Sequence, residues 1–542
     1  MSYDIAVNRN QFSIYTEERE QHGRSNIAAR AYGYGDMRGV TVHGWDVFDV
    51  MEKMSEAIYY AQLLRSTLLD VETYRLTGHN ADQIARDSQN PTLDEGKIRG
   101  LAPEEFKRAW EFFDPLKNCR RSLVAWEYAG VEELHAIEME EMKQAEQLFK
   151  NAFEEPEATL ENRGKKTIMI PHIWSQPNIS LGVSAKKRMR YKEAFIEVMR
   201  DLLCKDDRLT LCGQDIHLGG VLGETAGRGD YLLSQEFGEV RVSTAPISEE
   251  AMTSIGAGRS LYGGNAFVFY QFAPFWADSY PSWRSVIAPN FWQKNLRFNV
   301  KGIFPFGVVH DGGSGEYHES CVEGPLMNMG GIALLFPTDA YDVMGLVRGA
   351  HEYPGPVALF LQTYAFGTSE FAADVPDEPY VIPFGSARVR RLGKDVSVFA
   401  YGAASVKAAC NEAEFLSRLG IDVEVVDIRC LEPLDIETLA ASARRTGRVI
   451  IMHEASWRQG CGVHIKHRLD EALVNEHIKT RMFVHLLCAE DNPIPTKKKF
   501  LWQRLPFEQY VVKKEDDFGE PRTILRSHKL AQLARELTEV YR

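Results

Sequence analysis

Four polar clusters in the chain contain residue types that can do chemistry, and the first, second and fourth follow an apolar run of strand length. They are N-R-N-Q at residues 8–11, T-Y-R-L-T-G-H-N at 73–80, A-P-I-S-E-E at 245–250 and H-D-G-G-S-G-E-Y-H-E at 310–319. Ligand sites of open parallel sheets lie where the strands end. The four clusters are therefore the candidates for a binding or catalytic site.

The first two clusters suit a cation and a phosphate. The oxygen atoms of Asn10 and its neighbours are suitable ligands for a hard cation such as magnesium, although an asparagine here can equally cap a turn. His79, next to Gly78 and near Arg75, has the chemistry to contact a phosphate or a reacting carbonyl. An exposed loop histidine is the alternative, and spacing alone does not decide between them.

The other two clusters suit proton transfer. Glu249 is expected at a helix N-terminus, where the helix dipole favours a carboxylate. It is either an ordinary first-turn glutamate or a buried acid that protonates a ring nitrogen. The small residues over 251–258 would let another backbone or a ligand approach closely. His318 follows a glycine-rich loop and suits proton transfer or an anionic intermediate, unless it is an ordinary loop histidine.

Apolar runs of strand length predict the elements that would position these clusters. The runs cover residues 4–7, 40–42, 67–71, 266–272, 302–309, 331–336, 356–361, 396–401, 423–428, 448–452 and 482–487. Strands that are apolar on both faces need helices on both sides of the sheet, which predicts an α/β fold with parallel sheets. The three- and four-residue spacing of apolar residues over 131–149 predicts an amphipathic helix.

Length and composition set the remaining bounds. The 542 residues exceed what one core holds and predict about three domains. A charged stretch over 154–166 and a proline-rich acidic break over 374–379 predict boundaries between segments 1–160, 161–372 and 373–542.

Charge and cysteine usage exclude several classes of protein. The formal net charge of −13 argues against a nucleic-acid binder, and no apolar run approaches the roughly 20 residues of a membrane span. The first residues lack the pattern of a secretory signal. Eight cysteines without a C-x-x-C pair suit reduced, buried thiols and give no zinc signature. We expect a cytoplasmic protein without a nucleic-acid or membrane partner.

A series of short motifs, in order along the chain, resembles a known family. The motifs are N-R-N-Q-F-S-I, V-H-G-W-D, T-Y-R-L-T-G-H, P-I-S-E, Y-Q-F-A-P-F, Y-H-E-S, D-I-R-C-L-E-P-L-D and H-E-A-S. They resemble the thiamine-diphosphate-dependent decarboxylating components of 2-oxoacid dehydrogenases, which are related to transketolase. Residues 1–160 are similar to the C-terminal half of the α subunit, and the rest of the chain is similar to a complete β subunit.

The resemblance implies a thiamine-diphosphate-binding fold in three parts. Residues 1–160 would be half of a diphosphate-binding domain, 161–372 a pyrimidine-binding domain and 373–542 a transketolase-type C-terminal domain. In the first part, Asn10 matches the asparagine that ligates the magnesium ion holding the diphosphate, and the Phe12 carbonyl would be a second ligand. His79 matches a histidine near the diphosphate and the reacting centre.

The roles implied for the second part concern the aminopyrimidine ring and the acyl group. Glu249 matches the glutamate that bonds the ring and drives its activating tautomer. Ile247, Gln271 and Phe275 match residues that line the ring's pocket, with Phe275 stacking on it. His318 matches the histidine at the mouth of the site, where the acyl unit passes to a lipoyl group.

The chain also departs from the family pattern. The Gly-Asp-Gly motif that normally precedes the asparagine is absent, Arg9 replaces the first of two asparagines, and Gln214 stands where an acid is typical. The strand at 4–7 would then lie at an unpaired sheet edge. We therefore expect a second polypeptide that carries the Gly-Asp-Gly half, a shared active site and a heterotetramer.

The expected function is enzymatic. The resemblance implies that an acyl carbanion or enamine forms on the cofactor after decarboxylation of a 2-oxoacid, and that the acyl unit passes to a lipoyl group on a partner. One alternative is a two-component transketolase that moves a two-carbon ketol unit from a ketose phosphate to a lipoyl or carrier protein in natural-product biosynthesis. Another is a non-catalytic scaffold. The sequence leaves the donor, the acceptor, the partner and the pathway open.

Overall fold

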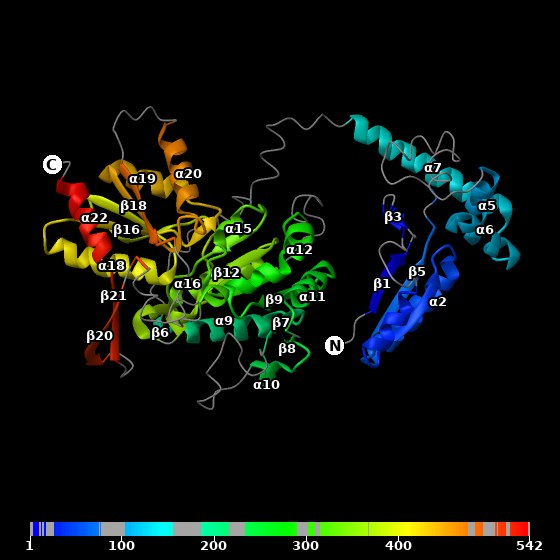
Figure 1. Ribbon diagram of the computed structural model, residues 1–542, viewed down its shortest axis with the longest axis horizontal. Coiled ribbons are helices and arrows are strands. Elements are labelled where there is room, and N and C mark those ends of the chain that lie inside the picture. The colour runs from blue at the N-terminus through cyan, green and yellow to red at the C-terminus, as the bar shows by residue number, and fades with distance from the viewer. Residues whose placement is uncertain are drawn as a thin grey trace. The chain divides into compact units, whose positions relative to one another are not determined.

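The protein is described here from a computed structural model (Figure 1). The structure describes residues 4–9, 12–13, 16–17, 26–74, 76, 103–154, 186–214, 216, 233–245, 247–289, 302–308, 315–366, 368–474, 483–491, 505–506, 508–515 and 521–539. The chain forms two compact units, 1–157 and 158–542, and each is described by itself.

Unit 1 contains a parallel sheet of three strands. The order is β1 (Asp4–Arg9), β5 (Thr67–Glu72) and β4 (Arg38–His43). Because neighbouring residues of a strand face opposite sides, Leu68 packs beside the short helix η1 (Ala28–Gly33) and Leu69 beside helix α2 (Val47–Gln62). The three predicted strands are present. The expectation that β1 is a buried strand is wrong, because Ile5 is 46% exposed.

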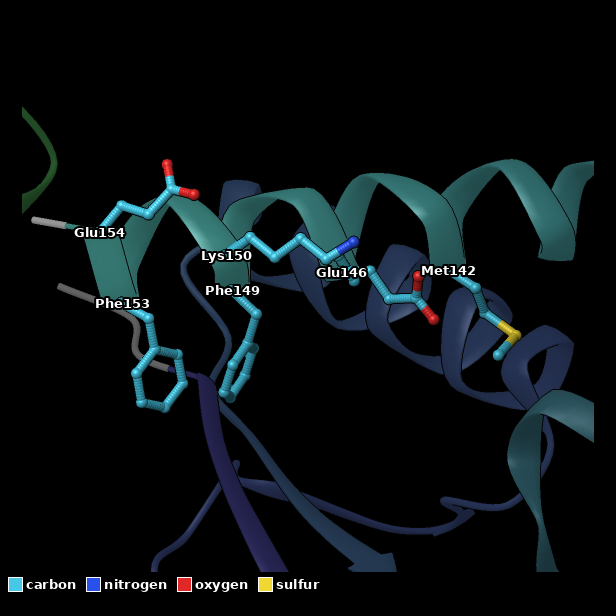
Figure 2. Close-up of a pocket in the computed structure, with 7 residues that line it drawn as sticks. Met142, Glu146, Phe149, Lys150, Phe153 and Glu154 are labelled. Carbon is cyan, nitrogen blue, oxygen red and sulfur yellow. The ribbon is translucent and has the colours of Figure 1, made fainter.

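The other described elements of unit 1 are one small hairpin and three helices. The hairpin pairs β2 (Phe12–Ser13) with β3 (Thr16–Glu17), and the helices are α5 (Pro103–Phe113), α6 (Pro115–Ala125) and α7 (Val131–Glu154). Helix α7 confirms the predicted helix, but none of its residues is buried. Figure 2 shows the rings of Phe149 and Phe153 on one side of this helix, where they line an open pocket of about 630 Å³.

Unit 2 contains a seven-stranded sheet, and the strands predicted within it are present. Its order is β17 (Cys430–Glu432), β11 (Ala333–Leu335), β12 (Val357–Gln362), β10 (Gly302–Val308), β9 (Asn265–Phe269), β7 (Leu209–Gly213) and β8 (Val242–Thr244). All pairings are parallel except that of β17 with β11. Helices α9 (Tyr191–Lys205) and α16 (Ala340–Glu352) cover one face, and α11 (Glu249–Leu261) covers the other.

Short helices connect the longer elements of unit 2. They are α10 (Leu233–Phe237), η6 (Ala273–Ser279), α12 (Tyr280–Ser282), the π-helical turn η7 (Trp283–Ile287), α14 (Glu316–Glu319), α15 (Glu323–Met327), α17 (Thr363–Phe366) and η8 (Ser369–Phe371). The stretch 273–287 is thus a succession of tight turns with no single helical period.

A second sheet of unit 2 has five strands. The order is β14 (Arg388–Arg391), β16 (Val423–Asp427), β15 (Val396–Ala400), β18 (Arg448–Ser456) and β19 (Phe483–Ala489). Only β14 is antiparallel to its neighbour. Helices α18 (Ala403–Ser417) and α22 (His528–Glu539) cover one face, and α19 (Ile436–Thr446) and α20 (Gly462–Val474) cover the other. The hairpin of β20 (Glu508–Glu515) and β21 (Pro521–Arg526) packs on α18 (Figure 1).

Two strand pairings cross the boundary predicted at residue 372. Strand β17 belongs to the seven-stranded sheet although it lies at 430–432, and β13 (Ala373–Pro376) pairs with β6 (Lys186–Met189). The two cores also continue from one sheet to the other. The division of the chain at 372 remains a prediction.

The state of the cysteines and the length of the helices can be compared with the sequence analysis. All eight cysteines are free thiols, and Cys212, Cys430 and Cys461 are buried as expected. The expectation of burial is wrong for Cys204, which is exposed, and for the other four, which are half-buried. Within the described part of the chain, no helix is long and apolar enough to cross a bilayer.

Candidate active site

Strand β9 and helix α11 position the first two candidate residues of unit 2. Ser248 caps α11, and its hydroxyl accepts a hydrogen bond from the backbone N–H of Ala251 at 3.4 Å. Glu249 is the first helical residue, as the helix-start pattern predicts. Its side chain is half-buried. Gln271 is half-buried and follows the carboxyl end of β9. Ile247, which precedes the cap, is 75% exposed in this unit.

The small residues of α11 serve mainly to bring the helix close to the sheet. A Cβ atom on Gly256 would lie 2.1 Å from Cγ2 of Val268 in β9, whereas one on Gly258 would meet nothing within 4 Å. The small residues over 251–258 were expected to let a backbone or a ligand come close. The segment that comes close is strand β9, and it does so at Gly256.

An aromatic cluster brings His318 together with the loop after β9. The ring centroid of His318, in α14, lies 4.7 Å from that of Phe272 and 5.5 Å from that of Phe275. The two phenyl rings are 5.3 Å apart. The Nδ1 atom of His318 is buried and has no hydrogen-bond partner among the described residues. A polar ligand at this cluster would therefore find a ring nitrogen available.

A network of buried hydroxyl groups lies behind Glu249, and the motifs did not reveal it. The Tyr270 hydroxyl contacts Thr253 Oγ1, lies 2.8 Å from Ser279 Oγ and accepts a hydrogen bond from Trp283 Nε1 at 2.9 Å. All four side chains are fully buried. Burial raises the pKa of Tyr270 to about 12, so its hydroxyl stays protonated at neutral pH. One available signal was the place of Thr253, four residues after Glu249.

The neighbouring acid has a partner of its own. Ser282 Oγ donates a hydrogen bond to Glu250 Oε1 at 2.7 Å and lies 2.8 Å from Ser254 Oγ. The two adjacent glutamates of the P-I-S-E-E run therefore differ in their surroundings. Gln214 lies in a turn directly after β7 and is half-buried.

The segment after His318 rests on a loop that follows β18. The Tyr401 hydroxyl donates a hydrogen bond to Glu323 Oε1 at 3.2 Å and accepts one from the backbone N–H of Cys461 at 2.9 Å. Gln459 Nε2 donates to Glu316 Oε1 at 3.4 Å. A cavity of about 10 Å³ lies beside these residues, with Gln362 and Glu454 in its lining. The size is that of a single water molecule.

The histidine of the H-E-A-S motif lies in the core. His453 is fully buried and stacks on Tyr401 with ring centroids 5.0 Å apart. Burial lowers its pKa to about 4, although the nearby Glu454 carboxylate partly offsets that shift. A Cβ atom on Gly460 or Gly462 would lie within 2.5 Å of the imidazole ring. The two glycines let the chain pass close to the ring, which indicates a structural role.

The candidate residues of unit 1 lie mostly beyond the structural description. Asn10 and His79 are outside the described residues, as are residues 155–166 of the linker predicted over 154–166. Phe12 lies in β2, where its backbone pairs with Glu17. Within the described residues, no group of three or more His, Cys, Asp or Glu side chains could hold a metal ion. The magnesium ligation by Asn10 and Phe12 remains a prediction.

Arg9, which departs from the family pattern, has a structural place. Its Nε atom donates a hydrogen bond to Asp70 Oδ1 at 2.8 Å, and its Nη2 atom contacts Glu72. The other oxygen of Asp70 accepts a hydrogen bond from the backbone N–H of Ile27 at 3.1 Å. The guanidinium group thus ties the end of β1 to β5.

Comparisons with known proteins agree with this architecture. The chain matches the family models of the dehydrogenase E1 component over residues 5–161, the transketolase pyrimidine binding domain over 187–366 and the transketolase C-terminal domain over 385–494.

Two curated relatives are beta subunits of dehydrogenases. The 2-oxoisovalerate dehydrogenase subunit beta of Bacillus subtilis is 33% identical over 270 residues, which are 49% of this chain and 79% of the relative. The pyruvate dehydrogenase E1 component subunit beta of Staphylococcus epidermidis is 30% identical over 333 residues, which are 60% of this chain and 97% of the relative.

A solved structure titled "Split gene transketolase, inactive beta4 tetramer" has a TM-score of 0.49 and 20% identity, and the match covers 65% of this chain and 100% of that one. The α/β fold with parallel sheets flanked by helices is as the sequence predicts. The chain belongs to the thiamine-diphosphate-dependent 2-oxoacid dehydrogenase and transketolase-like family.

Proposed function

We propose that the chain is the cofactor-activating part of a 2-oxoacid decarboxylating enzyme and that it transfers a short acyl unit to a lipoyl group on a partner protein. The observation that carries the proposal is the contact between His318 and Phe275 in the unit that also presents Glu249 at a helix N-terminus. The names of the relatives, which are dehydrogenase beta subunits for pyruvate and 2-oxoisovalerate, favour a 2-oxoacid over a ketose phosphate as the donor.

The residues of unit 2 fit an aminopyrimidine ring. The half-buried carboxyl group of Glu249 lies in α11, and the half-buried side chains of Gln271 and Phe275 lie after β9 and in η6. The buried Nδ1 atom of His318 has no partner among the described residues. Glu249 would bond a ring nitrogen, Phe275 would stack on the ring and Gln271 would lie at its edge. When bound, thiamine diphosphate supplies a nucleophilic carbon and an electron sink.

The protein's own groups would then manage protons and exclude water. The Glu249 carboxyl group would hold a proton at the ring nitrogen, and partial burial strengthens such a hydrogen bond. His318 would exchange a proton with the reacting group, since it is an imidazole held against two phenyl rings. Asn10, the Phe12 carbonyl and His79 would hold magnesium and the diphosphate.

We also propose that a second polypeptide with a Gly-Asp-Gly motif completes the diphosphate-binding half in a heterotetramer. Two features of unit 1 support this proposal. Strand β1 lies at the edge of a three-stranded sheet with Ile5 46% exposed, and α7 carries exposed Phe149 and Phe153 at 70% and 82%. Apolar edges and faces of this kind are normally covered in the assembled protein.

The proposed reaction is tested by turnover of the purified assembly with thiamine diphosphate and magnesium. Pyruvate, branched 2-oxoacids and xylulose 5-phosphate are offered in turn with a lipoyl-bearing acceptor. We expect carbon dioxide and acylated lipoyl groups from a 2-oxoacid, and their loss in Glu249→Gln but not in the neighbouring Glu250→Gln. A shortened aldose phosphate would instead identify a transketolase, and full activity of Glu249→Gln would favour a scaffold.

A further inference from the structure

We propose that the Tyr270 hydroxyl is a positioning group that holds Glu249 in register with the aromatic loop of the active site. The inference rests on the proposed function and extends it to a residue outside the aminopyrimidine pocket. The hydroxyl is the point where α11, the end of β9 and the turns over 273–287 meet.

The direction of each hydrogen bond around Tyr270 follows from its neighbours. Ser279 Oγ donates to the backbone carbonyl of Trp276 at 2.9 Å, so its proton is committed. The Tyr270 hydroxyl must therefore donate to Ser279 Oγ, at 2.8 Å, and accept from Thr253 Oγ1. Trp283 Nε1, a donor only, supplies the second accepted bond at 2.9 Å. One donated and two accepted bonds fix the hydroxyl in place.

The network reaches both sides of the site. Thr253 is four residues after Glu249 on α11, so the two side chains lie on the same face of the helix. Phe275 lies in η6, which Ser279 ends, and Trp283 begins the π-helical turn beyond it. Tyr270 directly precedes Gln271. A single buried phenol thus links the helix of the acid to the turns that carry the stacking ring and the amide.

Removal of this hydroxyl takes one hydrogen-bond partner away from each of three buried groups. Thr253, Ser279 and Trp283 are each fully buried, so water does not replace the lost bonds without a local shift. The chain would relieve the loss by moving α11 relative to the turns over 273–287. The distance between Glu249 and Phe275 would then no longer match the ring that both residues are proposed to hold.

The test compares two tyrosines of unit 2. Tyr270→Phe removes the central hydroxyl, and Tyr191→Phe removes the buried hydroxyl that donates to the Pro337 carbonyl at 3.1 Å in the other core cluster. Dissociation constants are measured by calorimetry on the full assembly for thiamine diphosphate with magnesium and for inorganic pyrophosphate with magnesium. Both variants should lower the melting temperature, because each loses a buried hydrogen bond.

The expected result separates positioning from general stability. Tyr270→Phe should weaken thiamine diphosphate binding at least tenfold and change pyrophosphate binding less than twofold, since pyrophosphate has no ring for Glu249 to hold. Tyr191→Phe should leave both constants within twofold. Thr253→Val should reproduce the Tyr270→Phe effect, and Thr253→Ser, which keeps the hydroxyl, should restore binding. If Tyr270→Phe does not fold, the comparison of Thr253→Val with Thr253→Ser tests the positioning role instead.

Equal thiamine diphosphate affinity in Tyr270→Phe and Tyr191→Phe would overturn the inference, as would equal affinity in Thr253→Val and Thr253→Ser. Equal weakening of thiamine diphosphate and pyrophosphate by Tyr270→Phe would also overturn it, because the effect would then be global. A wild-type assembly that binds pyrophosphate but not thiamine diphosphate would contradict the proposed function itself, and the inference with it.

Discussion

The backbone N–H of Gly324 donates a hydrogen bond to the backbone carbonyl of Gln459 at 3.0 Å. Gly324 lies in α15, six residues after His318, and Gln459 lies in the loop after β18. The five-stranded part of unit 2 therefore supports the segment that presents the candidate histidine.

Gly324→Ala should disturb this support. A Cβ atom at Gly324 would lie 2.4 Å from the Gln459 carbonyl oxygen, which is backbone and has little room to move. We expect a loss of about 1–3 kcal/mol in the free energy of unfolding, together with a drop in turnover of more than tenfold, measured by urea unfolding and by acyl transfer.

Gly258→Ala is the matched control, because a Cβ atom there meets nothing within 4 Å. Because Gly258 is an exposed helical position, Gly258→Ala should raise the free energy of unfolding by about 0.5–1 kcal/mol. Wild-type stability and turnover in Gly324→Ala would contradict the supporting role of the 459 loop.

Arg390 should be a major contributor to the stability of unit 2. Its guanidinium group contacts Asp339, Asp342 and Asp427, and the last two carboxylates are fully buried. Arg390→Met would remove the ion-pair partner of the buried Asp427 carboxylate, which costs about 3–5 kcal/mol. Urea unfolding should show this loss. Arg458→Met, at an exposed pair with Asp491, should cost under about 1 kcal/mol. Similar effects of both variants would refute the argument.

His453 should make the protein sensitive to acid. Its folded pKa is lowered to about 4, so between pH 6.5 and 4 the unfolded chain binds a proton that the folded chain does not. Folding stability should therefore fall as pH drops through this window, by roughly 3 kcal/mol at most. Unfolding midpoints measured from pH 7 to 4 check this.

The control for the acid effect is His467, which is 70% exposed. His453→Gln should flatten the pH dependence at some cost in stability at pH 7, whereas His467→Gln should leave the profile unchanged. An unchanged profile in His453→Gln would show that other groups cause the acid sensitivity.

The face of α7 that carries Phe149 should be needed for assembly with the second polypeptide. Phe149 is 70% exposed, so Phe149→Asp should leave the melting temperature of the chain alone within about 1–2 °C, as is usual for a surface change. The same change should abolish co-purification of the partner. Lys143→Asp, which also adds negative charge to α7, should keep the partner. Retention of the partner by Phe149→Asp would contradict this use of the face.

Most of the fold follows from local patterns, because parallel strands such as β12 and β15 are buried on both faces and appear as unbroken apolar runs. Strand β17 is different. It has three residues and pairs with a strand nearly a hundred positions earlier, which no local signal indicates. The turns over 273–287 mix 3₁₀, α and π geometry and have no single period to detect.

The individual residues of the candidate site could be predicted from the sequence, but the contacts between them could not. The positions of Glu249 and His318 next to strand ends follow from the sequence. The contact of His318 with Phe275 depends on how two distant loops pack, and spacing carries no information on that. The role of Tyr270 is still harder to predict from the sequence. A tyrosine at the end of an apolar run looks like any other core aromatic residue until the partners of its hydroxyl group are known.

The most direct measurement of the central claim is the rate of hydrogen–deuterium exchange at the thiazolium C2 position of thiamine diphosphate bound to the purified assembly. If Glu249 activates the aminopyrimidine ring, Glu249→Gln should slow this exchange about 100-fold or more, and Glu250→Gln should leave it within twofold of the wild-type rate. Equal exchange rates in the wild-type and Glu249→Gln assemblies, with the cofactor bound in both, would contradict the account.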